Sequence, residues 1–149
     1  MNETLKSLAL DLSKDFPRSP RETVGGYVLA GRTLDKCRAV LAGTEGEYHF
    51  DCPLDRMFFD FAGLDSEAFK AKVADGATDE EMGAWIKENA AQKEAIEVIK
   101  WNNDLRGKRI SEMADNLQEF LESYIEEFVP KHRPVYVWFD VYDLEEGRL

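Results

Sequence analysis

Apolar residues recur with helical spacing along much of the chain, between residues that typically start or stop helices. The clearest helix is predicted from Pro53, whose fixed φ suits a first helical position, to Gly63, which can end a helix in the left-handed conformation. Cys52 is then the N-cap, and Asp55 lies in the first turn, where the helix dipole favours a carboxylate. The apolar residues of this segment share one face: Leu54, Met57, Phe58 and Phe61.

Further helices are predicted before and after this segment. Thr33 is the expected N-cap of a helix that Gly43 ends, and residues 78–81 have the form of a capping box. Two more helices are expected over 65–76 and 91–106, the second with Ile96 and Ile99 inward. The longest pattern follows Ser111 and ends at Pro130, and we expect it to form the central spine of the core. Its apolar positions are Met113, Leu117, Phe120, Leu121, Tyr124, Ile125 and Phe128.

Residues 135–142 are β-branched and aromatic, which favours a strand. A strand needs a partner, and residues 47–50 are the best candidate; a packed irregular tail with a short helix is the alternative. The fold class is therefore predicted as mainly α. We expect a single compact domain over 1–149 with about six helices, an N-terminal arm over 1–10 and an aromatic, extended or helical tail over 131–149.

Composition narrows the function classes. The net charge of −11 and pI of about 4.7 disfavour a nucleic-acid partner. No apolar run approaches the length of a membrane span, and the start of the chain lacks the apolar segment of a signal peptide. We therefore expect a cytoplasmic protein with no membrane partner. The first 40 residues differ from the rest, because they carry seven basic and five acidic side chains.

Neither a cofactor nor a metal is predicted. The phosphate-binding patterns GxGxxG and GxxxxGK[ST] are absent. The two cysteines, Cys37 and Cys52, form no CxxC pair, and His49 with Cys52 supplies too few ligands for a structural metal. Cys37 lies on an apolar helix face and is expected in the core. A disulfide between the two cysteines stays open, although it would be uncommon in a cytoplasmic protein.

Two groups of residues could bind a ligand. Pro17 and Pro20 restrict the backbone around Arg18 and Arg21, and guanidinium groups held by a stiff loop can recognise a carboxylate or phosphate. The alternative is that these arginines pair with the protein's own carboxylates. At the predicted helix end, unsatisfied backbone N–H groups favour the thiolate of Cys52, whereas nearby carboxylates oppose it. The alternative for Cys52 is a small, half-buried cap residue.

Several short motifs together resemble a bacterial family of uncharacterised proteins, the domain-of-unknown-function family five-zero-six-nine. The resemblance covers residues 11–87, with a weaker similarity over 138–140, and it implies a small, cytoplasmic, mainly helical domain without an assigned activity. Cys37 departs from the family pattern, in which alanine is expected. The matching motifs are Pro17-Arg18-Ser19-Pro20, Gly25-Gly26-Tyr27, Asp35-Lys36-Cys37-Arg38-Ala39, Gly46-Glu47-Tyr48-His49, Cys52-Pro53-Leu54-Asp55 and Trp85.

Three functional hypotheses follow. The first is a binding module that holds an anionic small molecule between the Pro-Arg loop and the Cys52 helix end. The second is a protein-interaction or structural domain, for example a homo-oligomer that uses aromatic surface near Trp138. The third is a thiol enzyme or redox sensor with Cys52 as nucleophile and His49 as base, so whether the protein is an enzyme stays open. The ligand-binding residues predicted for the first are Arg18, Arg21, Tyr27, Tyr48, His49, Cys52 and Asp55.

Overall fold

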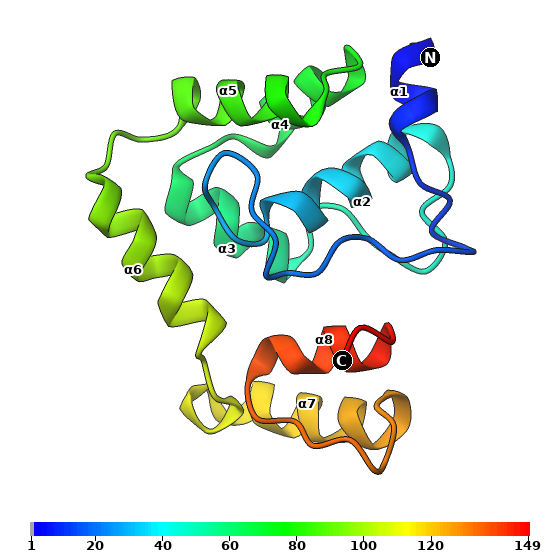
Figure 1. The fold of residues 1–149 in the computed structure, drawn as a ribbon, viewed down its shortest axis with the longest axis vertical. Helices are drawn as coiled ribbons and strands as arrows, with labels where there is room; N and C mark the ends of the chain where they lie inside the picture. Colours follow the sequence, from blue (N-terminus) through cyan, green and yellow to red (C-terminus); the bar gives the residue numbers. More distant parts are fainter. Residues whose placement is uncertain (1) are drawn as a thin grey trace. The chain divides into compact units, whose positions relative to one another are not determined.

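The structure is a computed structural model that describes residues 2–149, which form eight α-helices, one 3-10 turn and no β-strand. The predicted mainly α fold is therefore confirmed, with eight helices instead of about six. The chain divides into two compact units, one ending at Glu94 and the other spanning Ala95–Leu149. A single domain over 1–149 stays a prediction, and each unit is described by itself. The helices of the first unit are α1 (Glu3–Leu8), α2 (Ala30–Ala42), α3 (Pro53–Ala62), α4 (Ser66–Ala74) and α5 (Asp79–Asn89) (Figure 1).

Helix α2 is the central element of the first unit and crosses its middle in Figure 1. Residues 30–39 of α2 are all buried, and the helix packs against α1, α3 and α4. The sequence predicted Thr33 as the N-cap of this helix, with Lys36 and Arg38 off its apolar stripe and either solvated or facing the arginine loop. Instead α2 begins at Ala30, and the two charged side chains are only 3% and 4% exposed. Arg38 does face the arginine loop, because it and Arg18 bond the same carboxylate, Asp79. The charges of Lys36 and Arg38 are paired inside the unit, so α2 has no solvated face.

The core of the first unit is aromatic. Phe58 and Phe59 of α3 and Phe69 of α4 are fully buried, and the ring centroids of Phe59 and Phe69 lie 5.2 Å apart in an edge-on arrangement. Phe69 also contacts Trp85 of α5 at 6.0 Å between centroids. The bounds of α3 are as predicted, but its buried face is confirmed only in part: Leu54 and Phe58 are buried, whereas Met57 and Phe61 are half-buried. Phe59 and Ala62 are buried in addition.

The second unit contains α6 (Ala95–Arg106), the 3-10 turn η1 (Ile110–Glu112), α7 (Asp115–Phe128) and α8 (Trp138–Glu145). The expectation that the longest helical pattern forms the central spine is wrong, because Leu121 is the only buried residue of α7. The predicted inward positions of α6, Ile96 and Ile99, are also exposed. A small core instead forms around Val129, Val141 and Leu144.

Of the two alternatives for the aromatic tail, the strand is wrong and the packed tail with a short helix is confirmed. Residues 138–145 form α8, and the proposed strand partner, residues 47–50, forms turns and irregular backbone. Asp140 explains the outcome, because its carboxylate accepts backbone hydrogen bonds from Tyr136 and Val137 at 3.0 and 3.1 Å and so caps the start of α8. This local cap outweighs the strand propensity of the segment. Trp138, expected on an exposed aromatic surface, is buried.

Candidate functional site

The Pro-Arg loop, residues 17–21, holds Arg18 against helix α2. The backbone N–H, Nε and Nη2 of Arg18 all donate to the carboxylate of Asp35, at 2.9, 3.0 and 3.0 Å. Asp35 is buried on α2, and the carbonyl of Pro20 accepts a hydrogen bond from the N–H of Leu29 just before that helix. The stiff loop therefore does fix Arg18, and its first partner is one of the protein's own carboxylates.

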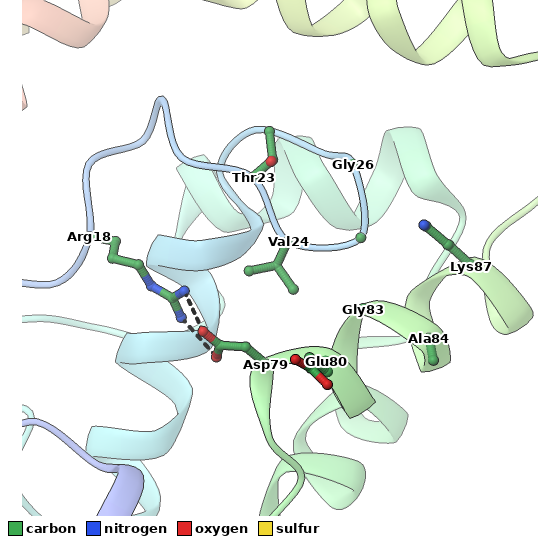
Figure 2. Close-up of a pocket in the computed structure, with 10 residues that line it drawn as sticks. Arg18, Thr23, Val24, Gly26, Asp79, Glu80, Gly83, Ala84 and Lys87 are labelled. Atoms are coloured by element: carbon green, nitrogen blue, oxygen red, sulfur yellow. Dashed lines mark hydrogen bonds and ion pairs between the residues drawn. The ribbon is translucent and has the colours of Figure 1, made fainter.

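A second carboxylate, Asp79 at the start of α5, completes an arginine–aspartate cluster of Arg18, Asp35, Arg38 and Asp79. Arg18 donates through Nη1 and Nη2 to the two oxygens of Asp79 at 2.8 and 3.2 Å (Figure 2). Arg38 donates to Oδ1 of Asp79 at 2.9 Å and to the carbonyl of Ala77 at 2.9 Å. The cluster thus joins the loop, α2 and α5.

The electrostatics of the cluster favour its charged forms. Burial opposes the ionisation of Asp79, but hydrogen bonds and charges from Arg18 and Arg38 outweigh it, so the pKa of Asp79 lies below its ordinary value. Burial likewise acts against the charge of Arg18, whereas Asp35 and Asp79 favour it, and the net effect raises the pKa of Arg18. Both side chains are therefore charged at neutral pH.

A cavity of about 500 Å³ lies beside this cluster. One wall is the ion pair between Arg18 and Asp79, and the facing wall is a tight turn that we call the glycine turn, residues 23–26 (Figure 2). The floor is the surface of α5 at Gly83 and Ala84. The complete lining is Arg18, Thr23, Val24, Gly25, Gly26, Asp79, Glu80, Gly83, Ala84 and Lys87.

Two glycines allow the turn to approach α5 closely. Gly25 has φ of +64°, and a Cβ added there would lie 3.1 Å from Ile86 and 3.2 Å from the carbonyl of Gly83. A Cβ added at Gly83 would in turn lie 3.4 Å from the backbone N of Gly25. Gly83 and Ala84, which form the floor of the cavity, carry little or no side chain, so they fill little of its volume.

Two charged side chains of the cavity are unpaired. Within residues 2–149, neither Glu80 nor Lys87 makes an ion pair or a side-chain hydrogen bond. Both lie on the face of α5 that also carries Gly83 and Ala84, because the four positions have i, i+3, i+4, i+7 spacing. In Figure 2 the Lys87 side chain extends from α5 toward the glycine turn. Glu80 and Lys87 were not predicted from the sequence, although a glycine inside a capped helix is a signal of close backbone approach.

Cys52 belongs to a different cluster, which we call the Lys36 cluster and which contains Thr33, Lys36, Cys52 and Asp55. The sulfur of Cys52 accepts a hydrogen bond from the Lys36 ammonium at 3.2 Å, and the same ammonium pairs with Asp55 at 2.9 Å. Thr33 donates to Asp55 at 2.7 Å, and the backbone N–H groups of residues 51 and 52 donate to its other oxygen. Asp55 thus joins α2 to the start of α3 and is 1% exposed.

This arrangement gives Cys52 a different neighbour from the one proposed. The sulfur contacts Lys36, whereas His49 is exposed and makes no hydrogen bond to it in the part of the chain that the structure describes. Both thiols are free, so no disulfide joins them. Cys37 lies in the core as predicted, and burial raises its pKa to about 12.

Of the seven predicted ligand-binding residues, only Arg18 lines the cavity. Tyr27 is buried against Phe58 and Phe61, and this burial raises its pKa. Tyr48 lies under the guanidinium of Arg32 at 5.6 Å. Arg21 is half-buried, and its backbone N–H donates to Ser19. With Cys52 and Asp55 in the Lys36 cluster, the cavity does not extend to the start of α3.

The described residues contain no group of three or more His, Cys, Asp or Glu side chains arranged to hold a metal ion. Among the helices within residues 2–149, none combines the length and the apolar character that a membrane crossing requires.

Comparison with known proteins gives a family and no activity. A search of curated proteins found no match for the chain. The model of the family described as "Domain of unknown function (DUF5069)" matches residues 14–148. This match includes the Pro-Arg loop, the glycine turn and every helix except α1, and it extends well beyond the residues 11–87 on which the sequence resemblance rested. The chain therefore belongs to the DUF5069 family, a family of unknown function.

Proposed function

We propose that the first unit is a binding module for a small anionic molecule, held in the cavity between the Pro-Arg loop, the glycine turn and α5. The observation that carries this proposal is the unpaired ammonium of Lys87 at the rim of a hollow whose floor is glycine and alanine. A ligand can reach this floor without displacing a large side chain. Its anionic group would gain a charged partner that has none in the described structure.

The residues of the cavity have distinct roles in this proposal. Lys87 supplies the positive charge. Arg18 has four of its five side-chain N–H groups bonded to Asp35 and Asp79, so it acts first as a rigid wall. The glycine turn brings backbone close to the ligand. The start of α3 is not part of the site, because Cys52 and Asp55 are engaged in the Lys36 cluster.

A thermal-shift experiment with small anions tests the proposal. Succinate, citrate and inorganic phosphate are added to the wild type, to Lys87→Gln and to a matched control, Lys14→Gln, whose side chain is 83% exposed and lies outside the cavity lining. A ligand present at 100 times its Kd stabilises the folded state by about 2.7 kcal/mol. We expect a rise in Tm for the wild type and the control, and a much smaller rise for Lys87→Gln.

Two outcomes contradict the proposal. One is that none of these anions raises the Tm of the wild type at millimolar concentration. The other is that Lys87→Gln responds as fully as Lys14→Gln, which would place the binding elsewhere. Arg18→Ala is a poor probe, because it would leave the buried carboxylate of Asp35 without its partner and would confuse folding with binding.

The second unit supports a second candidate function, association with another copy of the chain. Leu117, Phe120 and Phe128 of α7 are large apolar side chains that are exposed, Phe120 by 60%. They lie on one side of the helix, because they have the spacing i, i+3 and i+11. Exposed apolar surface of this kind is typical of an interaction site. For this candidate we propose the apolar side of α7 as the contact surface, since Trp138 is buried.

Sedimentation velocity with two α7 variants tests self-association. We expect the wild type to form dimers at micromolar concentration and Phe120→Glu to stay monomeric, because a carboxylate cannot be buried in an apolar contact without a partner. Ser123→Glu is the matched control, since it adds the same charge at an exposed position of the same helix outside the apolar side. A wild type that is monomeric at all concentrations rules out this candidate.

A further inference from the structure

The ion pairs that Asp79 forms differ from an ordinary ion pair at a protein surface. The two oxygens of Asp79 accept three hydrogen bonds from two guanidinium groups, Arg18 and Arg38. Its own side chain is nevertheless 50% exposed, whereas those of Arg18 and Arg38 are 24% and 4% exposed. A solvent-accessible carboxylate thus fills a receptor made of two largely buried arginines. This is the arrangement in which proteins recognise the carboxylate of a ligand.

Both arginines of the receptor also have partners other than Asp79. Arg18 is fixed by three hydrogen bonds to Asp35, and Arg38 by its bond to the carbonyl of Ala77. Without Asp79, the two arginines face one carboxylate, Asp35, and the cluster carries a net charge of +1. Moreover, the Nε of Arg38 is buried and has no hydrogen-bond partner. The site is therefore preorganised for an anion and electrostatically incomplete without one.

Asp79 can leave the receptor without unwinding α5. The helix is capped by Thr78 and Glu81, whose side chains bond each other's backbone N–H at 3.2 and 3.0 Å. Asp79 is the first helical residue and takes no part in that cap. A change of its side-chain rotamer toward solvent would therefore free the two guanidinium groups while the cap stays formed.

We infer that Asp79 is a built-in competitor for the ligand of the cavity: its carboxylate occupies the place on Arg18 and Arg38 that a carboxylate of the ligand takes on binding. This inference rests on the proposed function and names its ligand class, a small carboxylic acid. The two arginines already hold a carboxylate through three hydrogen bonds, so the receptor fits this group. The rest of the ligand would lie over Gly83 and Ala84 toward Lys87.

A competitor within the chain lowers the apparent affinity, because only molecules with Asp79 displaced can bind. Removing the competitor should therefore tighten binding. Asp79→Asn removes its negative charge, and Glu80→Gln is the matched control. Glu80 is the next residue of α5, lines the same cavity and carries the same charge, but it does not bond the arginines. Any general effect of lowering the negative charge near the cavity is common to both variants.

The experiment is isothermal titration of the wild type and both variants with succinate and, separately, with inorganic phosphate. We expect Asp79→Asn to bind succinate about tenfold more tightly than Glu80→Gln does, with a smaller gain for phosphate. An Asp79→Asn protein that binds succinate no more tightly than Glu80→Gln overturns the inference and leaves the proposed function standing. An equal gain for phosphate overturns the carboxylate assignment. No binding by the wild type or by either variant overturns the proposed function and the inference together.

A measurement on the wild type covers the case in which Asp79→Asn folds poorly. If succinate displaces Asp79, its carboxyl carbon resonance in a ¹³C-labelled wild type shifts on titration, because the carboxylate loses both guanidinium partners. Glu80, which has no such partners in the described structure, serves as the internal reference. Succinate that binds and leaves the Asp79 resonance unchanged overturns the inference.

Discussion

Replacing Lys36 by methionine is expected to destabilise the first unit by about 3–5 kcal/mol, the typical cost of breaking a buried ion pair from one side. Methionine fits the volume of the lysine stem, so packing changes little. What is lost is the positive charge 2.9 Å from the carboxylate of Asp55, which is 1% exposed and cannot turn to solvent. The penalty arises because the buried carboxyl group of Asp55 loses the positive charge that compensates it.

The double variant Lys36→Met/Asp55→Asn is the control for this mechanism. Asparagine keeps an oxygen that can accept from Thr33 or from the backbone N–H groups at residues 51 and 52, but it carries no charge. The double variant should therefore be more stable than Lys36→Met alone, although it carries one more substitution. Urea unfolding gives the free energies, and amide hydrogen exchange locates the loss in α2 and α3. A double variant at least as unstable as the single one would show that lost packing, and not an unpaired charge, is responsible.

The parts of the fold that are encoded locally were predictable from the sequence. Pro53 and Gly63 fix the bounds of α3 through their own backbone preferences, and Thr78 with Glu81 starts α5 through two hydrogen bonds over three residues. These signals need no knowledge of the rest of the chain. The cap that Asp140 forms at α8 is equally local, but the β-branched and aromatic composition of the tail concealed it.

The buried charges of α2 were not predictable in the same way. Lys36 and Arg38 lie off the apolar stripe, and a charged residue in that position is usually solvated. Their partners, Asp55 and Asp79, are 19 and 41 residues further along the chain, so only the folded structure brings them together. The candidate site was missed for the same reason. Arg18 was identified from its own loop, whereas Gly83 and Lys87 became relevant only when α5 was placed beside the glycine turn.

Helix α7 shows a further limit of periodicity. Its apolar face is real, with Leu117, Leu121 and Phe128 at helical spacing, and the pattern is the longest in the chain. A pattern specifies which side of a helix can be buried, but the amount of burial depends on what lies opposite. The first unit instead buries α2 on all sides, since its polar groups are paired. The strength of the pattern therefore did not identify the central helix.

The matched pair Phe69→Ala in α4 and Phe120→Ala in α7 compares a buried aromatic core position with the apolar side of α7. Phe69 is fully buried in contact with Phe59 and Trp85, and its removal should destabilise the protein by about 3–5 kcal/mol, because it deletes apolar contacts and leaves a cavity among rings that cannot collapse freely. The identical substitution at Phe120, which is 60% exposed, should change stability by less than about 0.5 kcal/mol. Both are measured by urea unfolding at protein concentrations low enough to exclude association. If Phe120→Ala lowers the free energy of unfolding as much as Phe69→Ala does, the apolar side of α7 is buried in the folded monomer. The prediction that α7 is the central helix of the core would then be correct.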